Sequence, residues 1–341
     1  MATAPLATRP VPERIFNTLN AFQSTAALKT AFELDLFTAI AEGANQAATL
    51  AERVGAAERG VRILADYLAI QGFVTKEGGR YSLAQETAGF LDRRSPAYMG
   101  TLIGFLASDR HKQSFERLTD AVRAGGSVMP EADNRQPQDK MWVAFAKSMS
   151  PLTGPSAVFM AQLAGMQEQK PSKILDVAAS HGMFGITFAL QNPKAQIVAL
   201  DWPAVLEVAK ENARAAGVGD RVRLRPGSVF EADLGTDYDL VLLTNILHHF
   251  DKATNERLLE RIHAALKPGG RAITLEFVPN EDRITPPTAA AFSLIMLTGT
   301  AAGDAYTFSE YEAMFKNVGF LKNTLYQLPA GAQQVVVSEK A

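Results

Sequence analysis

The sequence predicts an α/β protein with a doubly wound sheet in its second half and a smaller, mainly α-helical domain before it. Residues 172–341 alternate short apolar strands with helical segments, which indicates a sheet covered by helices. Lys173–Asp201 reads as strand, tight turn, helix, strand and acid, the βαβ unit of nucleotide-binding folds. Residues 13–91 show helical spacing of apolar side chains and contain one short hairpin pattern.

Composition excludes several classes of protein. The 341 residues carry a net charge of −2, are 47% hydrophobic and include no cysteine. A net charge this close to zero gives no reason to expect a nucleic acid or membrane partner. Because the chain has no cysteine, disulfides and thiolate metal sites are excluded. No uncharged apolar run approaches the ~20 residues that span a bilayer, and the start lacks the apolar segment of a signal peptide. We therefore expect a cytoplasmic protein.

The first domain has a winged-helix pattern. Prolines within residues 1–12 predict a loose arm, and the segments 48–54 and 58–71 form a helix pair. A Gly78-Gly79 turn then joins two short strands. The second helix of the pair carries two arginines but also two acidic residues. Since DNA affinity depends on cations placed against phosphates, we interpret this layout as a protein-interaction module rather than a DNA reader.

The elements of the second half follow in order from apolar runs and their stop signals. We expect helices at 183–190, 204–216, 255–266, 288–297 and 309–318, and strands at 174–177, 197–200, 222–224, 240–244, 272–275, 323–327 and 334–338. Lys267-Pro-Gly-Gly270 should end a helix and form a turn. Strands separated by helices predict a parallel sheet. Ligand and chemistry should then lie at the carboxyl ends of the strands, where the sequence places Asp176, Asp201, Asn245, His248 and Glu276.

The turn after the first strand differs from a dinucleotide-binding fingerprint. That fingerprint uses glycines so that the backbone can approach a pyrophosphate, whereas Ala178 and Ser180 carry a Cβ here. S-adenosylmethionine has no phosphate and suits such a turn better than NAD. Asp201 lies about 20 residues beyond the turn, where these folds place a carboxylate on the ribose hydroxyls. Asp176 either contacts the cofactor through solvent or only holds the turn, and His181 in the turn is interpreted as a local hydrogen-bonding residue.

Several segments together resemble the dimeric S-adenosylmethionine-dependent O-methyltransferases of the plant caffeate and acetylserotonin type and their bacterial relatives. They are Leu200–Pro203, Gly227–Phe230, Leu247–Phe250, Leu266–Gly270 followed by Glu276, and Phe145–Met149 with Thr153. The resemblance implies a class I methyltransferase fold, a doubly wound Rossmann-like sheet preceded by a mainly α winged-helix dimerisation domain. It implies a dimerisation domain at 1–100, a helical linker at 101–165, a methyltransferase domain at 166–341, and a homodimer.

The resemblance also implies roles for single residues. His248 would be the general base and Glu276 the carboxylate that supports it. The predicted cofactor-binding residues are Asp176, Ala178, Gly182, Asp201, Trp202, Ser228, Val229, Phe230 and Asn245. The predicted acceptor-binding residues, which come from two apolar stretches and the histidine pair, are Trp142, Phe145, Met149, His249, Phe292 and Met296. Within this scheme Asp201 would hold the ribose, Phe230 would flank adenine, and Gly182 would let the cofactor approach the turn.

Departures from the family pattern keep alternatives open. Ser228 replaces the aspartate that usually reaches adenine, His249 and Phe250 replace the usual Asp-Trp, and Ala305 stands where a second glutamate is expected. The first hypothesis is methylation of a hydroxyl on a small aromatic acceptor, with S-adenosylhomocysteine as product. The alternatives are carbon or nitrogen methylation on the same fold, or a winged-helix regulator without catalysis. We expect no metal, since neighbouring side chains such as His248 and His249 diverge on a helix.

Overall fold

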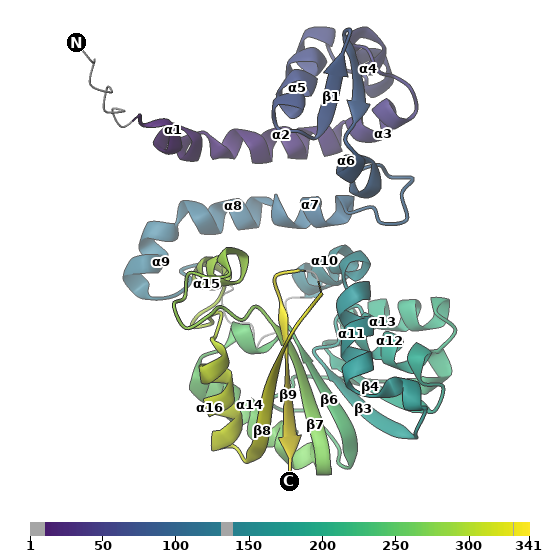
Figure 1. Cartoon of the computed structure of the whole chain (residues 1–341), viewed down its shortest axis with the longest axis vertical. Helices are drawn as coiled ribbons and strands as arrows, with labels where there is room; N and C mark the ends of the chain where they lie inside the picture. Colours follow the sequence, from purple (N-terminus) through teal and green to yellow (C-terminus); the bar gives the residue numbers. More distant parts are fainter. Residues whose placement is uncertain (1–10, 131–138, 330) are drawn as a thin grey trace, which may run out of the picture. The chain divides into compact units, whose positions relative to one another are not determined.

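The structure is a computed structural model that describes residues 11–130, 139–329 and 331–341. It divides the chain into two compact units, Met1–Ala107 and Ser108–Ala341 (Figure 1). Of the arm predicted at residues 1–12, residues 1–10 lie outside the described residues. Within the described ranges, every helix is too short or too polar to cross a bilayer.

The first unit contains a helix pair and a two-stranded antiparallel sheet, as the winged-helix pattern predicts. Gly55 ends the first helix of the pair in the left-handed region at φ +66°, a conformation that glycine adopts without strain. Gly78 and Gly79, at φ +52° and +77°, make the hairpin turn. The elements are α1 (Glu13–Leu19), α2 (Ala21–Glu33), α3 (Leu36–Ala41), α4 (Ala47–Val54), α5 (Glu58–Ile70), β1 (Val74–Glu77), β2 (Arg80–Leu83), α6 (Gln85–Phe90) and α7 (Gly100–Leu106).

The helices of this unit differ sharply in burial. Helix α5 buries Val61, Ala65 and Leu68, which recur at the spacing of one helix face. Helices α1 and α2 instead leave apolar side chains in the open: Ile15, Phe16, Leu19 and Phe22 are each more than half exposed. We call these four side chains the α1–α2 apolar face. Large apolar side chains left exposed within one short segment indicate an interaction surface.

The second unit is built on a seven-stranded sheet with helices on both faces. Its helices are α8 (Asp109–Glu116), α9 (Leu118–Ala124), α10 (Asp139–Met149), α11 (Gly154–Leu163), α12 (Met183–Gln191), α13 (Pro203–Ala215), α14 (Lys252–Ala265), α15 (Pro287–Gly299) and α16 (Phe308–Asn317). Its strands are β3 (Ser172–Val177), β4 (Ala195–Asp201), β5 (Val222–Pro226), β6 (Tyr238–Thr244), β7 (Leu266–Glu276), β8 (Phe320–Gln327) and β9 (Gln334–Lys340). The predicted α/β class and the order of elements are thereby confirmed.

The strand order is β5-β4-β3-β6-β7-β9-β8. The chain winds from β3 outwards through β4 to β5 and then crosses to the other side of β3 to form β6. This reversal is the switch point at which open α/β sheets bind ligands. The carboxyl ends of β3, β4, β5 and β6 therefore meet around one crevice, because these four strands pair in parallel.

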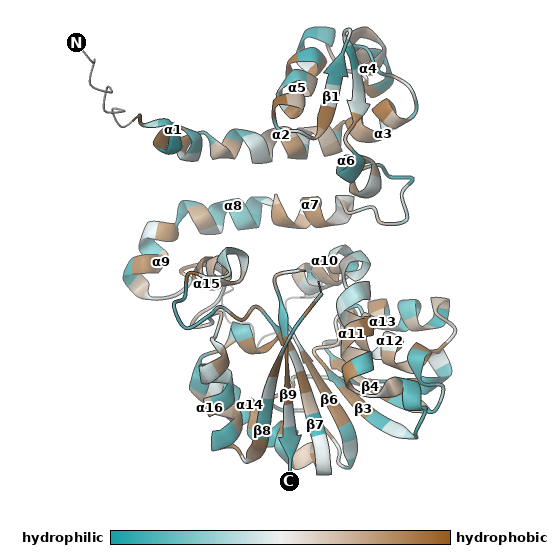
Figure 2. Cartoon of the chain, viewed as in Figure 1, coloured by the Kyte–Doolittle hydropathy of each residue, from teal (hydrophilic) through white to brown (hydrophobic). Residues whose placement is uncertain are grey.

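Side chains of the central strands alternate between two cores. Leu175, Val177 and Val241 pack with α14 and α16 on one face, while Ile174 and Leu240 pack with α11, α12 and α13 on the other. Figure 1 shows these helix groups against opposite faces of the sheet, and Figure 2 shows β6 apolar along most of its length. Strands buried on both faces read as continuous apolar runs, which is why their positions could be predicted.

Two predicted details of the sheet were wrong. Strand β9 runs antiparallel to both β7 and β8, so the sheet is not parallel throughout. The segment Lys267–Gly270 is not a free turn: β7 starts at Leu266, directly after α14, and the register slips between Leu266 and Arg271 opposite Tyr238 and Leu240. The four residues lie opposite Asp239 alone and interrupt the pairing within the strand, which a local reading of proline and glycine cannot distinguish from a turn.

Candidate active site

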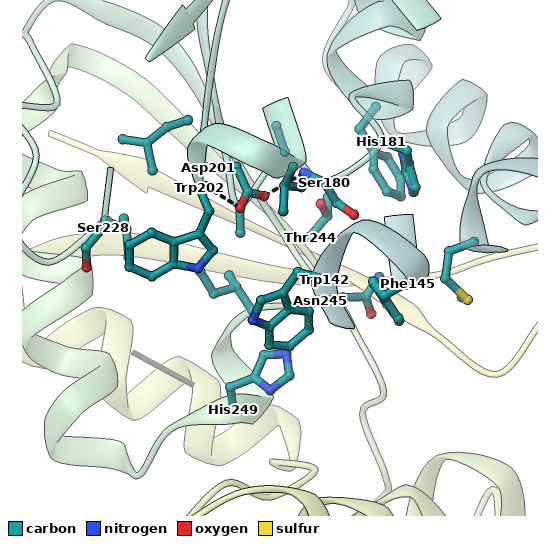
Figure 3. A pocket seen from close by; sticks show the side chains of 18 of the residues that line it. Trp142, Phe145, Ser180, His181, Asp201, Trp202, Ser228, Thr244, Asn245 and His249 are labelled. Atoms are coloured by element: carbon teal, nitrogen blue, oxygen red, sulfur yellow. Dashed lines mark hydrogen bonds between the residues drawn. The ribbon is translucent and has the colours of Figure 1, made fainter. Parts of the chain in front are cut away.

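A pocket lies over the carboxyl ends of β3, β4, β5 and β6, with α10 as a further wall (Figure 3). It encloses about 120 Å³, roughly ten times the space that one ordered water occupies. Eleven of the predicted site residues line it: Trp142, Phe145, Met149, Ala178, Asp201, Trp202, Ser228, Val229, Phe230, Asn245 and His249. Asp176, Gly182, His248, Glu276, Phe292 and Met296 are absent from its lining.

The turn after β3 is held in an uncommon backbone conformation. Ala178 and Ser180 have φ values of +52° and +53°, in the left-handed region that costs a non-glycine residue roughly 1–2 kcal/mol. The backbone N–H of Ser180 donates to the Asp201 carboxylate at 2.8 Å, and the N–H of Ala179 donates to the carbonyl of Leu200. These two bonds tie the turn to the end of β4 and support its strained shape.

Asp201 is the charged centre of the pocket. Its carboxylate accepts from the Ser180 N–H at 2.8 Å and from the Trp202 N–H at 2.6 Å, as Figure 3 shows with dashed lines. Burial raises the pKa of this carboxyl group to about 6, although both backbone donors act in the opposite direction. Each carboxylate oxygen can accept more than one hydrogen bond, so Asp201 retains acceptor capacity for a ligand in the pocket.

Asp176 lies below the turn rather than in the pocket. It is fully buried, and its Oδ2 accepts from the Gly185 N–H at 3.0 Å in the first turn of α12. Its Oδ1 is buried without a hydrogen-bond partner among the described residues. Burial, and secondarily the charge of Asp201, raises the pKa of Asp176 to about 7. Of the two roles left open by the sequence, this geometry supports the one that holds the turn and the start of α12.

Gly182 lies where two helices come close together. At φ +73° it precedes α12, and a Cβ built on it would lie 2.9 Å from the Cβ of Ala209 in α13. The lack of a side chain therefore lets α12 approach α13. Its expected role in letting a cofactor approach the turn stays a prediction.

Aromatic and apolar side chains form one end of the pocket, beyond the end of β4. Trp202 follows Asp201 directly, and Ser228, Val229 and Phe230 follow β5. The ring of Phe230 packs edge to face on Phe250 at 5.1 Å between centroids. This end offers flat apolar surfaces of the kind that hold a planar base.

Asn245 is positioned by a residue that the sequence did not indicate. It follows β6 at φ +57°, and its N–H donates to the Leu275 carbonyl at 2.9 Å. The side-chain amide of Gln333, in the segment before β9, donates to Asn245 Oδ1. Only the antiparallel return of β9 brings Gln333 next to a residue 88 positions earlier.

Helix α10 supplies an aromatic wall. Ala146 packs with Val205 and Val208 of α13 and thereby fixes α10 over the pocket. Trp142 lies edge to face with Phe145 at 5.9 Å and with His249 at 5.5 Å between ring centroids. Burial and then the neighbouring His248 lower the pKa of His249 well below its usual range, so this pocket side chain is neutral at pH 7.

His248 and Glu276 form a buried pair beside the pocket. His248 lies in the short helix η4 (Leu247–His249) and Glu276 ends β7; His248 Nδ1 and Glu276 Oε2 are 2.5 Å apart. The other carboxylate oxygen accepts from the Leu247 N–H at 2.8 Å. A carboxylate accepts only, so Nδ1 carries the ring hydrogen and Nε2 is left as an acceptor.

Two predicted acceptor-binding residues of α15 are absent from the pocket lining, and one of them packs on this pair. The Phe292 ring packs edge to face on the His248 ring at 4.9 Å and stacks on Phe277 at 4.0 Å. Met296, one turn further along α15, is buried. The His249 ring lies 4.4 Å from the His248 ring and also lines the pocket, so it connects the pair to the pocket.

Gly303 is a further residue that the sequence analysis missed. A Cβ there would lie 2.1 Å from the backbone oxygen of His248 and 2.9 Å from the carbonyl carbon of His249. The segment after α15 can therefore press against η4 only because residue 303 has no side chain. A lone glycine in a loop gives no local signal of such an approach.

The residues of the pocket fit an S-adenosyl nucleoside. Asp201 offers a buried acceptor for ribose hydroxyls, and Ser180 Oγ is buried without a hydrogen-bond partner among the described residues. The Cβ atoms of Ala178 and Ser180 narrow the turn where a dinucleotide would place its pyrophosphate. Within the described ranges, no group of three or more His, Asp and Glu side chains could hold a metal ion. Fold and site together define a class I, nucleoside-binding methyltransferase.

Comparison with known proteins identifies the family to which the chain belongs. Residues 115–321 match the O-methyltransferase domain and residues 16–92 the O-methyltransferase dimerisation domain. The chain therefore belongs to the S-adenosylmethionine-dependent O-methyltransferase family and is an enzyme.

Its relatives include one protein of closely similar structure. A candidate O-methyltransferase from Nostoc punctiforme, known from a crystal structure, shares 51% sequence identity with this chain. The two structures align with a TM-score of 0.94, over 97% of this chain and 100% of that one. The 3-hydroxy-5-methyl-1-naphthoate 3-O-methyltransferase of Streptomyces sahachiroi is 29% identical over 93% of this chain and 92% of that protein. The tetracenomycin polyketide synthesis 8-O-methyltransferase of Streptomyces glaucescens is 28% identical over 91% of each.

Proposed function

We propose that this enzyme methylates the hydroxyl group of a small aromatic compound, with His248 as general base. The observation that carries the proposal is the buried His248–Glu276 pair, whose 2.5 Å contact leaves the opposite ring nitrogen free to accept a proton. Two relatives in Streptomyces are named for O-methylation of a hydroxynaphthoate and of a tetracenomycin intermediate. Both names describe aromatic acceptors, which suits a pocket walled by Trp142 and Phe145.

The cofactor would lie along the pocket with its ribose at Asp201. Trp202, Val229 and Phe230 would hold the adenine between apolar surfaces, with Ser228 at its edge. Ala178 and Asn245 would contact it from the ends of β3 and β6. When bound, S-adenosylmethionine supplies an electrophilic methyl group on a sulfonium, so the protein's tasks are alignment and an electron-rich acceptor.

His248 would make the hydroxyl oxygen of the methyl acceptor electron-rich by removing its proton. A phenol has a pKa near ~10 and is mostly protonated at neutral pH. Nε2 of His248 would take the hydroxyl proton as transfer proceeds, an effect of typically ~10²–10⁴-fold. Glu276 would hold the ring in the tautomer with hydrogen on Nδ1 and stabilise the imidazolium that forms.

The acceptor would lie between α10 and η4. Trp142, Phe145 and Met149 offer an apolar surface, and the neutral His249 adds a polar ring without a charge. Phe292 and Met296 would close the side of His248 that faces α15. A planar, uncharged ring with a hydroxyl directed towards His248 meets these requirements.

We further propose that three parts of the chain have separate roles and that the enzyme is a homodimer. Residues 1–100 would pair two copies, 101–165 would form the acceptor wall, and 166–341 would hold the cofactor and the base. The dimerisation domain at residues 16–92 supports pairing, and the α1–α2 apolar face offers exposed surface for it. The enzyme would act in the cytoplasm, where S-adenosylmethionine is supplied.

The proposal is tested by product analysis. The purified chain is incubated with S-adenosylmethionine carrying a ¹³C methyl group and a panel of phenols, naphthols and their carboxylated analogues. We expect S-adenosylhomocysteine to form with at least one uncharged aromatic hydroxyl compound, and the NMR signal of the new methyl to be that of a methoxy group. A methyl attached to carbon or nitrogen would overturn the hydroxyl assignment, and aliphatic acceptors alone would overturn the aromatic one.

A further inference from the structure

His181 is a buried pocket residue whose ring orientation is set by the protein. It follows Ser180 in the turn after β3, is 4% exposed and lines the pocket. Its Nδ1 accepts from the Met183 N–H at 3.1 Å. An imidazole nitrogen that accepts cannot carry hydrogen, so the neutral ring has its hydrogen on Nε2. Among the described residues, no hydrogen bond to that Nε2–H is present, and burial lowers the pKa of His181 to about 4, which keeps the ring neutral at pH 7.

The ring stands in front of the amino end of α12. That helix starts at Met183 and runs for 9 residues, so its first N–H groups present a partial positive charge. Two of these groups are already engaged: Met183 N–H donates to His181, and Gly185 N–H donates to Asp176. The Met183 N–H donates to Nδ1 and so polarises the imidazole ring, which makes the Nε2–H of His181 a stronger hydrogen-bond donor. His181 therefore presents a neutral, polarised N–H donor to the pocket.

The position of His181 relative to Asp201 matches the two ends of the cofactor. In Figure 3, Trp202 and Ser228 lie on one side of Asp201, while Ser180 and then His181 lie on the other. With the ribose at Asp201 and the adenine towards Trp202, the amino acid portion must extend towards His181. That portion ends in a carboxylate, which a neutral N–H donor backed by a helix amino end binds favourably.

We propose that His181 is a cofactor-binding residue whose Nε2–H donates to the carboxylate of the amino acid tail of S-adenosylmethionine and S-adenosylhomocysteine. This inference rests on the proposed cofactor orientation and adds a specific donor to it. If His181 only stabilised the turn, Nδ1 alone would be needed, and replacing the residue would change the binding of every adenosine ligand to the same extent.

Two ligands and two variants separate these roles. S-adenosylhomocysteine carries the tail carboxylate, whereas 5′-methylthioadenosine has the same nucleoside and sulfur but no amino acid portion. In His181→Asn the shorter amide can still accept from Met183 N–H but does not reach the place of Nε2. In His181→Gln the amide nitrogen reaches the place of Nε2 and retains the donor.

Calorimetric titration of the full-length chain tests the proposal. We expect His181→Asn to weaken S-adenosylhomocysteine binding by about 10- to 100-fold, the usual effect of losing a hydrogen bond to a charged group. Binding of 5′-methylthioadenosine should stay within about threefold, and His181→Gln should retain most of the affinity for S-adenosylhomocysteine.

Other results would overturn the assignment. Equal loss for both ligands would show a structural histidine, and unchanged S-adenosylhomocysteine affinity with a raised KM for the phenol would assign His181 to the acceptor. If the wild-type chain bound neither nucleoside, the proposed function itself would fail, which is a different result from a loss confined to the tail.

Discussion

Nδ1 of His248 lies 2.5 Å from Oε2 of Glu276, and both side chains are buried, at 4% and 0% exposure. The pair joins two segments 28 residues apart, the short helix after β6 and the last residue of β7. Because Oε1 of the same glutamate accepts from the Leu247 N–H, the carboxylate is held at both oxygens. His248 therefore has one orientation and one favoured tautomer.

The first prediction concerns that tautomer. In Glu276→Gln the amide oxygen can still accept from Leu247 N–H, which turns the amide nitrogen, a donor, towards His248 Nδ1. Nδ1 must then accept, so Nε2 carries the hydrogen and cannot take a proton from the acceptor. We expect kcat to fall by about 10²–10⁴-fold, with S-adenosylhomocysteine affinity nearly unchanged in calorimetry.

His248→Ala is the companion variant and should produce a loss of similar size. If both variants also lost cofactor affinity to the same extent as kcat, the pair would be structural. An activity loss in His248→Ala alone would mean that Glu276 does not set the tautomer.

The second prediction is a pH dependence of cofactor binding. The Asp201 carboxylate must be ionised to accept from both ribose hydroxyls, and burial raises its pKa to about 6. Affinity for S-adenosylhomocysteine should therefore fall about tenfold between pH 7 and pH 5. Burial lowers the pKa of His181 to about 4, so its ring stays largely neutral over this pH range and does not account for the dependence.

Asp201→Asn serves as the control for this titration. It should bind S-adenosylhomocysteine weakly at every pH and lose most of the slope. A wild-type affinity that stayed constant from pH 5 to pH 7 would contradict the assignment of the ribose to Asp201.

The third prediction concerns stability. Burial raises the pKa of Asp176 to about 7, so the folded chain retains a proton there that the unfolded chain releases above about pH 4. The free energy of unfolding should therefore fall as pH rises from about 4 to about 7. In Asp176→Asn, urea midpoints should vary less over this range. A steeper dependence in the variant would show that Asp176 is ionised in the folded state at low pH.

The fourth prediction concerns Gly303. In Gly303→Ala the new Cβ would meet the His248 backbone oxygen at 2.1 Å, so either the loop or η4 must move. We expect a loss of roughly 1–3 kcal/mol in the free energy of unfolding, together with a lower kcat. Gly299→Ala, at the end of α15, is the matched control because nothing lies within 4 Å of its added Cβ. Equal thermal midpoints for the two variants would rule out the close approach at Gly303.

The fifth prediction concerns assembly. The α1–α2 apolar face exposes Leu19 and Phe22 at 66% and 68%, and a charge there would remain uncompensated in an interface. We expect the wild-type chain to sediment with the mass of two chains, and Phe22→Asp to shift towards the mass of one. Leu321→Asp, on β8 and 69% exposed, is the control and should remain paired. A wild-type mass of one chain would contradict the homodimer.

Much of this protein could be predicted from local sequence patterns. Apolar runs such as that of β6 and stop signals such as Gly55 depend on neighbouring residues alone, so the elements and their order followed from them. The spacing between the turn and Asp201 is likewise short-range, because one βαβ unit has a nearly constant length. The resemblance supplied the family and directed attention to His248 and Glu276.

The tertiary structure decided what depends on residues far apart in the chain. The antiparallel course of β9 between β7 and β8, and with it the contact of Gln333 with Asn245, depends on pairing between strands that are far apart in the chain. Gly182 and Gly303 are needed because other elements approach them, and Asp176 is held below the turn by Gly185. Local sequence determines which conformation a segment prefers, whereas burial, pKa and hydrogen-bond partners arise only when distant segments exclude water together.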